Sequence, residues 1–394
     1  MAKRSEQPDN APAAKPVIAV TMGDPAGVGP EVVVKALADP VLRRRARFVV
    51  FGMNELLAYA ADLAEIEPFW FRLQHDSPRA AYALTHDVVV LDYDEYSMLG
   101  TAIHQPTRQG GQASIRFLED AIAAALKPTY AEGRVDAVAT APISKTSWKL
   151  AGLTRFPGHT ELFAHRTKAR RHAMLFHAPP IVPPDVAASA AHAGSAAHAG
   201  SPQDQTTTPS APSRNRPFNV VLATIHLPLM DIRNVLTIGK VYDPIDLGNQ
   251  TLKDLGIDKP RIAVCGLNPH AGEEGLFGDE EQRLITPAIE MARQHGIDAH
   301  GPFPADTLFT PHNLARYDLF VAMYHDQGLI PVKMLAFDSA VNMTLGLPVI
   351  RTSPDHGTAF DIVGQNQAEP GSMKSALQLA IDSATAIAAK RPDR

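Results

Sequence analysis

Short, nearly continuous apolar runs recur along this 394-residue chain, and they constrain its fold more than any other feature. Each run is rich in β-branched residues and ends near Gly, Pro or Asp. They are VIAVT at 17–21, RFVVFG at 47–52, HDVVVLDY at 86–93, DAVATAP at 136–142, NVVLATI at 219–225, RIAVCG at 261–266 and DLFVAMY at 318–324. Because strands buried on both faces show this pattern, the runs favour parallel pairing.

Helical patterns lie between several of these runs. The stretch 30–39 begins with a proline, which suits a first helical turn. The stretch 113–126 places Phe117, Leu118 and Ile122 near one face. Alternating strands and helices predict an α/β fold. At about 100–200 residues per domain, the length predicts about two domains.

Two segments depart from this pattern. Residues 1–15 are polar, and we expect a disordered leader followed by a catalytic region over 16–394. Residues 178–217 contain eight prolines, ten alanines and five serines, with a tandem AAHAGS repeat at 190–201. Such a stretch buries too little apolar surface to offset its ordering entropy, so we expect a disordered surface insertion. Its two repeat histidines could bind metal, although flexible spacers are the simpler interpretation.

Charge and composition exclude several classes of protein. The net charge is −5 with both signs mixed, so there is no electrostatic case for nucleic-acid binding. The single cysteine, Cys265, excludes an intramolecular disulfide and any multi-cysteine zinc or iron–sulfur site. No apolar run approaches the ~20 residues of a membrane span, and the leader has no apolar signal core. We therefore expect a cytoplasmic protein without a membrane partner.

Two loops follow predicted strands and carry polar or glycine-rich motifs. TMGDPAGVGPE at 21–31 passes from a strand through a glycine-rich turn into a helix, which suits either an anion or a purely structural tight turn. TAPISK at 140–145 ends in Lys145, which could bind a phosphate or carboxylate beyond the strand, or be a solvated charge.

Three histidines lie near the ends of predicted strands, namely His226, His270 and His325. Three imidazoles at one rim of a sheet could hold a divalent metal and leave positions open for substrate. Asp306 and Asp326 could be further ligands, partners of the ligands or general bases. No local spacing forces the histidines together, so their convergence depends on the fold.

A last cluster, at 333–364, places two cations and an amide within one stretch: Lys333, Asn342 and Arg351. Arginine suits bidentate capture of phosphate or carboxylate, while lysine acts as a point charge. Each of these residues taken singly is also compatible with an ordinary surface position.

Taken together, the motifs resemble the 4-hydroxythreonine-4-phosphate dehydrogenase family of pyridoxal phosphate synthesis. The motifs are MGDPAGVGPE, TAPISK, PGHTE, HLPL, CGLNPHAGE, PADTLF, YHDQGLIPVK and VNMTLGLPVIRTSPDHGTAFDI. The resemblance runs from about residue 17 to about residue 386, apart from the insertion. It implies a fold similar to isocitrate and isopropylmalate dehydrogenases, with two α/β domains around an active-site cleft, and a homodimer with a shared active site.

The resemblance also assigns roles residue by residue. It implies that His226, His270 and His325 bind one divalent metal per subunit, which could be Zn, Mg, Co or Mn. It implies that the substrate contacts His159, Thr160, Lys333, Asn342 and Arg351. It implies NAD or NADP binding without the Rossmann glycine fingerprint. Asp326, Asp306 and Lys145 remain alternatives for the general base.

The implied reaction oxidises 4-phosphooxy-L-threonine to a 3-keto acid, which decarboxylates to 3-amino-2-oxopropyl phosphate. The alternative is a sibling dehydrogenase that acts on four-carbon threonate or erythronate phosphates. A metabolite-binding protein without catalysis would be expected to lack some of these metal or anion ligands, and none is missing here.

Overall fold

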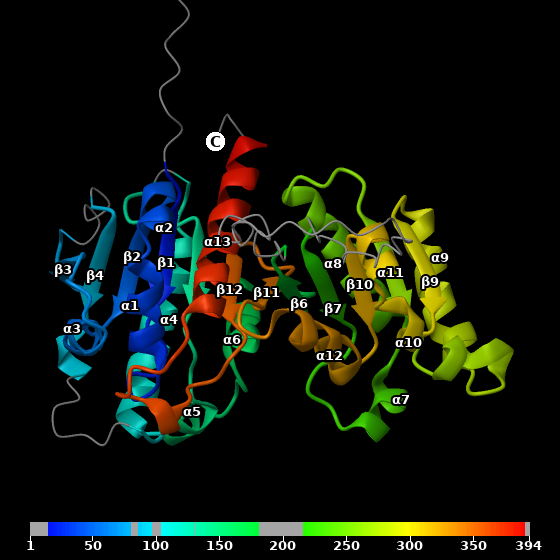
Figure 1. Ribbon diagram of the computed structural model, residues 1–394, viewed down its shortest axis with the longest axis horizontal. Coiled ribbons are helices and arrows are strands. Elements are labelled where there is room, and N and C mark those ends of the chain that lie inside the picture. The colour runs from blue at the N-terminus through cyan, green and yellow to red at the C-terminus, as the bar shows by residue number, and fades with distance from the viewer. Residues whose placement is uncertain (1–14, 80–85, 97–103, 130, 181–215, 391–394) are drawn as a thin grey trace, which may run out of the picture. The chain divides into compact units, whose positions relative to one another are not determined.

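The computed structural model describes residues 15–79, 86–96, 104–129, 131–180 and 216–390. Two compact units interleave along the chain (Figure 1). The first unit comprises the residues up to Pro157, Gly357–Pro370 and the residues from Leu377 on; the second comprises Gly158–His356 and Gly371–Ala376. The last helix, α13 (Gly371–Ala389), therefore begins in the second unit and continues in the first.

A parallel sheet forms the centre of the first unit, in the order β3-β4-β2-β1-β5. Its strands are β1 (Val17–Thr21), β2 (Arg47–Gly52), β3 (Phe71–Gln74), β4 (Val88–Asp92) and β5 (Ala137–Thr140). The associated helices are α1 (Gly29–Leu37), α2 (Pro40–Arg45), α3 (Asn54–Leu63), α4 (Arg108–Ala125) and α5 (Lys145–Leu150), with the short turns η2 (Asp94–Tyr96) and η8 (Phe360–Ile362).

A mixed sheet forms the centre of the second unit, in the order β12-β11-β6-β7-β10-β8-β9. The strands β7 (Phe218–Leu222), β10 (Leu319–Ala322), β8 (Arg261–Cys265) and β9 (Asp298–Phe303) pair in parallel. The strands β6 (Ala173–Ala178), β11 (Val341–Leu345) and β12 (Ile350–Pro354) are joined by antiparallel pairs, and β6 also pairs antiparallel with β7.

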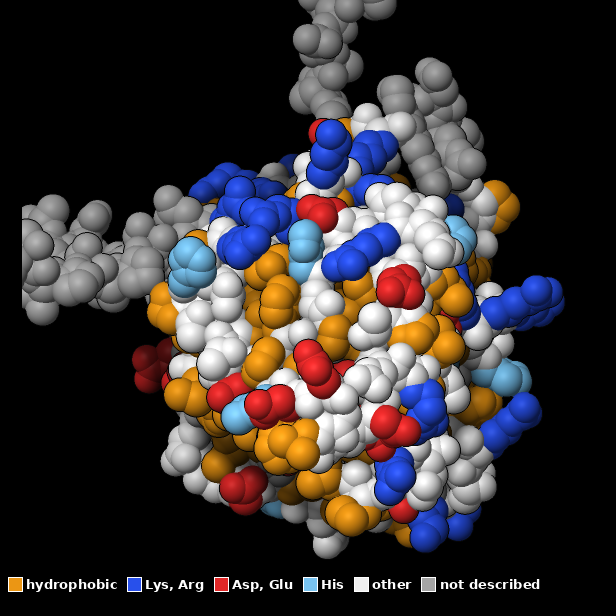
Figure 2. All heavy atoms as spheres, turned by 90° about the vertical axis from the view of Figure 1, so that its right-hand side faces the viewer, with side chains coloured by type: hydrophobic (Ala, Val, Ile, Leu, Met, Phe, Trp, Pro, Cys, Tyr) orange, Lys and Arg blue, Asp and Glu red, His pale blue; other side chains and the backbone are white. Residues whose placement is uncertain are grey.

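Helices and short turns connect the strands of the second unit. They are α6 (His159–Thr167), η5 (Leu229–Asp231), α7 (Ile232–Val235), α8 (Ile238–Asp254), η6 (Pro269–Gly275), η7 (Glu281–Ile285), α9 (Thr286–Gln294), α10 (Ala305–Leu308), α11 (Pro311–Arg316) and α12 (His325–Ala336). The buried core includes Phe218 and Phe320 of the sheet together with Leu329 and Val332 of α12. Figure 2 looks onto the side that carries β9 and α9, where hydrophobic side chains lie between charged ones.

The predicted α/β class is confirmed, and all seven predicted strands are present in parallel pairs. Sequence analysis missed β3, β6, β9, β11 and β12. The two strands that carry candidate site residues show why. Asn342 interrupts the apolar character of β11, and Arg351 interrupts that of β12. Polar side chains inside a buried strand remove the pattern on which strand prediction depends.

The helix α4 begins earlier than predicted because Thr107 caps it, and two glycines let its first turn pack closely. The Thr107 hydroxyl accepts a hydrogen bond from the Gly110 amide at 2.9 Å, which caps the helix one turn before the apolar stripe. A Cβ on Gly110 would lie 2.5 Å from Asp24 Oδ1, and one on Gly111 would lie 2.1 Å from the Ser147 carbonyl oxygen. The first turn of α4 therefore approaches its neighbours more closely than any larger residue allows.

The low-complexity insertion begins later than the sequence predicts. Ala178 was placed at its start, but this residue is buried and pairs with Phe218 as the last residue of β6. Residues 181–215 lie outside the described part of the chain, as does the predicted leader up to residue 14. The two flanks of the insertion are thus neighbouring antiparallel strand ends.

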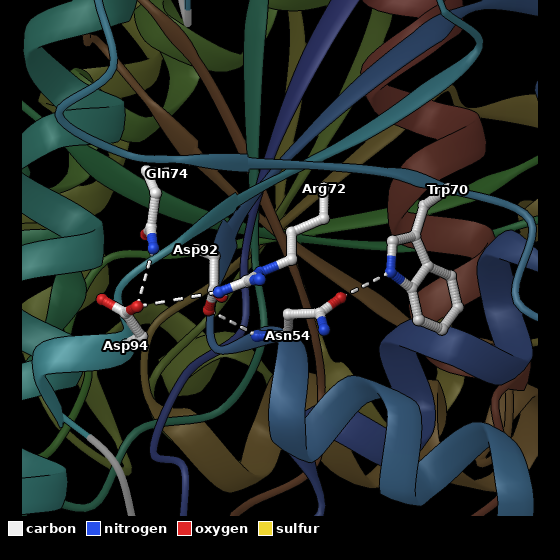
Figure 3. A network of polar contacts seen from close by, with 6 residues as sticks. All are labelled: Asn54, Trp70, Arg72, Gln74, Asp92 and Asp94. Carbon is white, nitrogen blue, oxygen red and sulfur yellow. Dashed lines mark hydrogen bonds and ion pairs between the residues drawn. The ribbon is translucent and has the colours of Figure 1, made fainter.

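A polar network ties the edge strand β3 to the rest of the first sheet (Figure 3). Asp92, at the end of β4, accepts hydrogen bonds from the backbone amide of Asn54 at 2.8 Å and from Arg72 Nε at 2.6 Å. Trp70 Nε1 donates to Asn54 Oδ1 at 2.9 Å. The buried Asp92 carboxylate therefore satisfies a backbone amide in the first turn of α3 and also binds Arg72 of the exposed strand β3. No helix among the described residues is long and apolar enough to cross a membrane.

Candidate functional site

The carboxyl ends of β7, β10 and β8 lie side by side, and a candidate metal histidine follows each of them. His226 follows β7, His325 is the first residue of α12 after β10, and His270 lies in η6 after β8. The rings of His226 and His325 have centroids 5.7 Å apart. The fold thus supplies the convergence of strand ends that the sequence alone could not show.

Hydrogen bonds fasten these three strand ends to one another. The Thr224 hydroxyl donates to the Met323 carbonyl at 2.7 Å, which joins the segments that carry His226 and His325. Gln327 accepts from the Met323 amide at 2.7 Å and donates to the Gly266 carbonyl at 2.8 Å. One side chain of α12 therefore links the segment of His325 to the segment that leads to His270.

Carboxylates engage two of the histidines at Nδ1. His325 Nδ1 lies 2.7 Å from Asp326 Oδ1, and His270 Nδ1 lies 2.7 Å from Glu273 Oε2. The hydrogen bond that the His270 ring donates to Glu273 raises the pKa of His270, and the charge of Asp306 acts in the same direction. A carboxylate at one ring nitrogen is the usual partner of a metal-binding histidine, because it orients the other nitrogen toward the metal. The donor set therefore fits a divalent cation.

The described part of one chain does not bring the three histidines together as a complete ligand set. Among the described residues, no three His, Cys, Asp or Glu side chains form a group that could hold a metal ion. His226 and His325 face one another, whereas His270 is 65% exposed at its side chain.

A second group of predicted residues surrounds a buried guanidinium in the same unit. Arg351, on β12, is 3% exposed, and its Nη1 donates to Thr344 Oγ1 of β11 at 3.2 Å. Its guanidinium carbon lies 6.0 Å from the centroid of the Phe163 ring. Burial lowers the pKa of Arg351 to about 10, and the Glu161 carboxylate opposes that shift. The group remains a cation at neutral pH.

His159 and Thr160 form the first turn of α6, near this guanidinium. Burial lowers the pKa of His159 well below its usual range, and the Arg351 charge adds to the effect. His159 is therefore neutral at physiological pH. The helix starts after Gly158, which offers no side-chain cap. A buried arginine beside the amino end of a helix is a favourable setting for an anion.

Lys333 and Asn342 differ in how they are held. Lys333 Nζ lies 2.5 Å from Asp355 Oδ2 and donates to the Asp355 carbonyl at 3.0 Å, so its charge is balanced within the unit. Asn342 lies in β11 opposite Ser353. Its Oδ1 is buried and accepts no hydrogen bond from the described residues. An unsatisfied buried amide oxygen is costly, and a donor group on a ligand would satisfy it.

The three general-base candidates remain distinct in position. Asp326 is exposed, and its carboxylate forms a hydrogen bond with His325 Nδ1. Asp306 is exposed on α10 and close enough to act on the charge of His270. Lys145 begins α5 in the first unit and is exposed. Geometry alone assigns none of them as the base.

The loop after β1 contains a buried carboxyl to which the sequence pattern assigns no role. Asp24, in the TMGDPAGVGPE motif, is fully buried, and its Oδ1 accepts from the Ala26 amide at 3.0 Å. Burial raises its pKa, and hydrogen bonds from Ser147 and Ala26 oppose the shift. The same loop borders a small surface pocket whose lining includes Pro25, Val28 and Tyr59.

Comparisons with known proteins agree over nearly the full length of the chain. Residues 44–380 match the family model described as "Pyridoxal phosphate biosynthetic protein PdxA". The chain is 40% identical over 381 residues to a 4-hydroxythreonine-4-phosphate dehydrogenase from Desulforapulum autotrophicum, covering 96% of this chain and 99% of the relative. It is 38% identical over 371 residues to a D-threonate 4-phosphate dehydrogenase from Cupriavidus necator, covering 94% and 98%.

A solved structure supports the same assignment. The crystal structure of a 4-hydroxythreonine-4-phosphate dehydrogenase from Klebsiella pneumoniae aligns with a TM-score of 0.73 and 36% identity, covering 94% of this chain and all of that one. The fold and these relatives define an α/β oxidoreductase of the dehydrogenase class. Within that class, the chain belongs to the PdxA family of pyridoxal phosphate biosynthesis.

Proposed function

We propose that this enzyme oxidises the secondary hydroxyl of 4-phosphooxy-L-threonine with NAD or NADP. The resulting 3-keto acid loses carbon dioxide and gives 3-amino-2-oxopropyl phosphate. The observation that carries this proposal is the buried Arg351 beside the amino end of α6, which is a preformed setting for an anionic end of such a substrate. The relatives named as dehydrogenases of phosphorylated hydroxy acids support the same substrate class.

The candidate substrate residues of the second unit would make different kinds of contact because their charges differ. Arg351 presents a fixed cation, and the neutral His159 presents a ring nitrogen without adding charge. Asn342 offers an amide whose oxygen has no donor among the described residues. Lys333 would bind a second anionic group by exchanging its contact with Asp355. Together these contacts fix the reacting carbon, which lowers the entropic part of the barrier.

A bound metal and a nicotinamide would together lower the pKa of the substrate hydroxyl, accept the hydride and stabilise the charge left by decarboxylation. His226, His270 and His325 would hold the metal. Their neutral nitrogen donors favour zinc, cobalt or manganese over magnesium. The contacts of Asp326 and Glu273 with two of these rings support that role.

We further propose a homodimer whose partner subunit completes the site. Exposed apolar side chains lie near each of the three histidines in the sequence. They are Leu227, Leu229 and Met230 near His226, Leu276 and Phe277 near His270, and Ile330, Met334 and Phe337 after His325. Ile330, Met334 and Phe337 follow helical i, i+4, i+7 spacing and are 59%, 81% and 71% exposed. A second copy of the chain would cover this surface and could supply the missing imidazole.

The main alternative keeps the reaction and changes the substrate to a four-carbon threonate or erythronate phosphate. It is supported by the relative from Cupriavidus necator, whose identity differs by only two percentage points from that of the Desulforapulum relative. Steady-state kinetics with 4-phosphooxy-L-threonine and D-threonate 4-phosphate, each with NAD and NADP, separate the two. A higher kcat/KM for 4-phosphooxy-L-threonine supports the main proposal, and a higher value for D-threonate 4-phosphate contradicts it. We place this metabolic role in the cytoplasm.

A further inference from the structure

A buried carboxylate holds the loop that carries His270. Glu281 is 3% exposed, and its Oε1 accepts hydrogen bonds from the backbone amides of Leu267 and Asn268, both at 2.7 Å. Its Oε2 accepts from Asn268 Nδ2 at 2.9 Å. Three donors satisfy this buried anion, which makes the contact strong and costly to break. Neither the motif analysis nor the proposed mechanism gives Glu281 a role.

The loop that carries His270 has a run of backbone φ angles in the left-handed region. Five successive residues, from His270 to Glu274, have φ between 41° and 83°. Only glycine adopts this left-handed region freely, and Gly272 is the single glycine among the five. A run of this length persists only where surrounding contacts over-determine it. The conformation of His270 therefore depends on its neighbours and not on local preference.

Glycines on both sides of the loop make room for the carboxylate. A Cβ on Gly272 would lie 2.7 Å from Glu281 Oε2, and one on Gly266 would lie 3.1 Å from Glu281 Oε1. Glu280 adds an outer contact, since its Oε2 accepts from Asn268 Nδ2 at 2.8 Å. Glu280 also forms an ion pair with Arg233 of α7 at 3.3 Å. The loop therefore lies against the Glu281 carboxylate from Gly266 to Gly272.

We propose that Glu281 is a positioning residue that holds the left-handed turn at 270–274 and so presents the His270 imidazole for metal binding. The part that concerns the metal rests on the proposed function. The carboxylate acts through the backbone of Leu267 and Asn268, two and three residues before His270, and has no direct contact with a reacting group. Weakening it should release the loop while leaving the sheet of the unit in place.

The test compares Glu281→Gln with the matched control Glu290→Gln in the full-length protein. Glu290 is an exposed glutamate on the neighbouring helix α9. A glutamine at 281 keeps the size but sets an NH₂ group against the Asn268 amide donor. Deuterium uptake of the peptide 266–278 reports the loop, and titration with Co²⁺ alone reports the site. We expect loop exchange at least ~10-fold faster and Co²⁺ affinity ~10–100-fold weaker in Glu281→Gln.

Glu280→Gln tests the same proposal more gently if the first variant folds poorly. It removes only the outer contact, so we expect smaller changes in the same direction. Unchanged loop exchange in a folded Glu281→Gln protein would overturn the positioning role. Faster exchange with unchanged Co²⁺ affinity would refute the link to metal binding. If the unsubstituted enzyme binds no Co²⁺, the proposed metal site fails, and loop exchange alone decides whether Glu281 holds the turn.

Discussion

At the residue scale, two buried polar side chains of the second unit differ in their charge at neutral pH. Arg351 is a buried cation, whereas the neighbouring His159 is kept neutral by the same burial and by that cation. A neutral imidazole beside a guanidinium can contact an anionic ligand without competing for its charge.

The depressed pKa of His159 predicts a pH-dependent stability. Between the folded-state pKa and the unfolded value near ~6.5, the unfolded chain binds the proton that the folded chain refuses. Stability should therefore fall as pH decreases below ~6.5, by up to about 1.4 kcal/mol per pH unit from this group. His159→Asn should remove that slope, as measured by urea unfolding at pH 7.5 and 5.5. The exposed His172 provides a control, and equal slopes for His159→Asn and His172→Asn would contradict the assignment.

Arg351→Lys should behave as a binding defect. Lysine keeps the positive charge but loses the planar fork that reaches Thr344 and a ligand together. We expect substrate KM to rise by about 10-fold or more with a smaller change in kcat, as for a lost ground-state contact. Steady-state kinetics over a wide substrate range measure both terms. A fall in kcat at unchanged KM would instead place Arg351 in transition-state stabilisation.

At the scale of elements, strands with nearly continuous apolar runs were predictable, and the two that carry Asn342 and Arg351 were not. The runs that became β1, β2 and β10 are apolar apart from Thr21 and Arg47 at strand ends, so their burial is visible in the sequence. The candidate substrate residues Asn342 and Arg351 lie in β11 and β12, and their polarity hides these strands. His226 and His325 were placed correctly at strand ends, but their approach to one another depends on the order β7-β10-β8, which no local pattern encodes.

The insertion between β6 and β7 should be dispensable. Its flanks pair at Ala178 and Phe218, so a short link can join them without moving either strand. Loop-closure entropy changes by only ~0.6 kcal/mol per doubling of length. Replacing residues 183–213 with a short Gly/Ser link should leave the melting temperature and kcat/KM nearly unchanged. A well-folded product with little activity would show that the segment has a functional role.

At the scale of the whole molecule, the proposed dimer would account for both the exposed apolar side chains and the separation of His270 from the other two histidines. In this proposed dimer, His226 and His325 would come from one chain and His270 from its partner. Mixing inactive His226→Ala and inactive His270→Ala proteins then creates hybrid dimers with one intact site. Random exchange should restore about a quarter of the full activity, since half the dimers are hybrids with one working site each.

The hybrid experiment needs a control for nonspecific rescue. Mixing His226→Ala with His325→Ala should restore nothing if these two ligands come from the same chain. Sedimentation of the unsubstituted enzyme at assay concentration gives the oligomeric state independently. A fully active monomer would rule out a shared site, whatever the mixing experiments show.

The most direct test of the account is a measurement of NADH or NADPH formation from 4-phosphooxy-L-threonine before and after exhaustive chelation. The account predicts turnover in the untreated enzyme, its loss in the chelated enzyme, and recovery on adding Zn²⁺, Co²⁺ or Mn²⁺. Alanine at His226, His270 or His325 should prevent recovery, whereas His172→Ala should not. Full activity in chelated enzyme that elemental analysis shows to be free of metal would contradict both the metal assignment and the mechanism built on it.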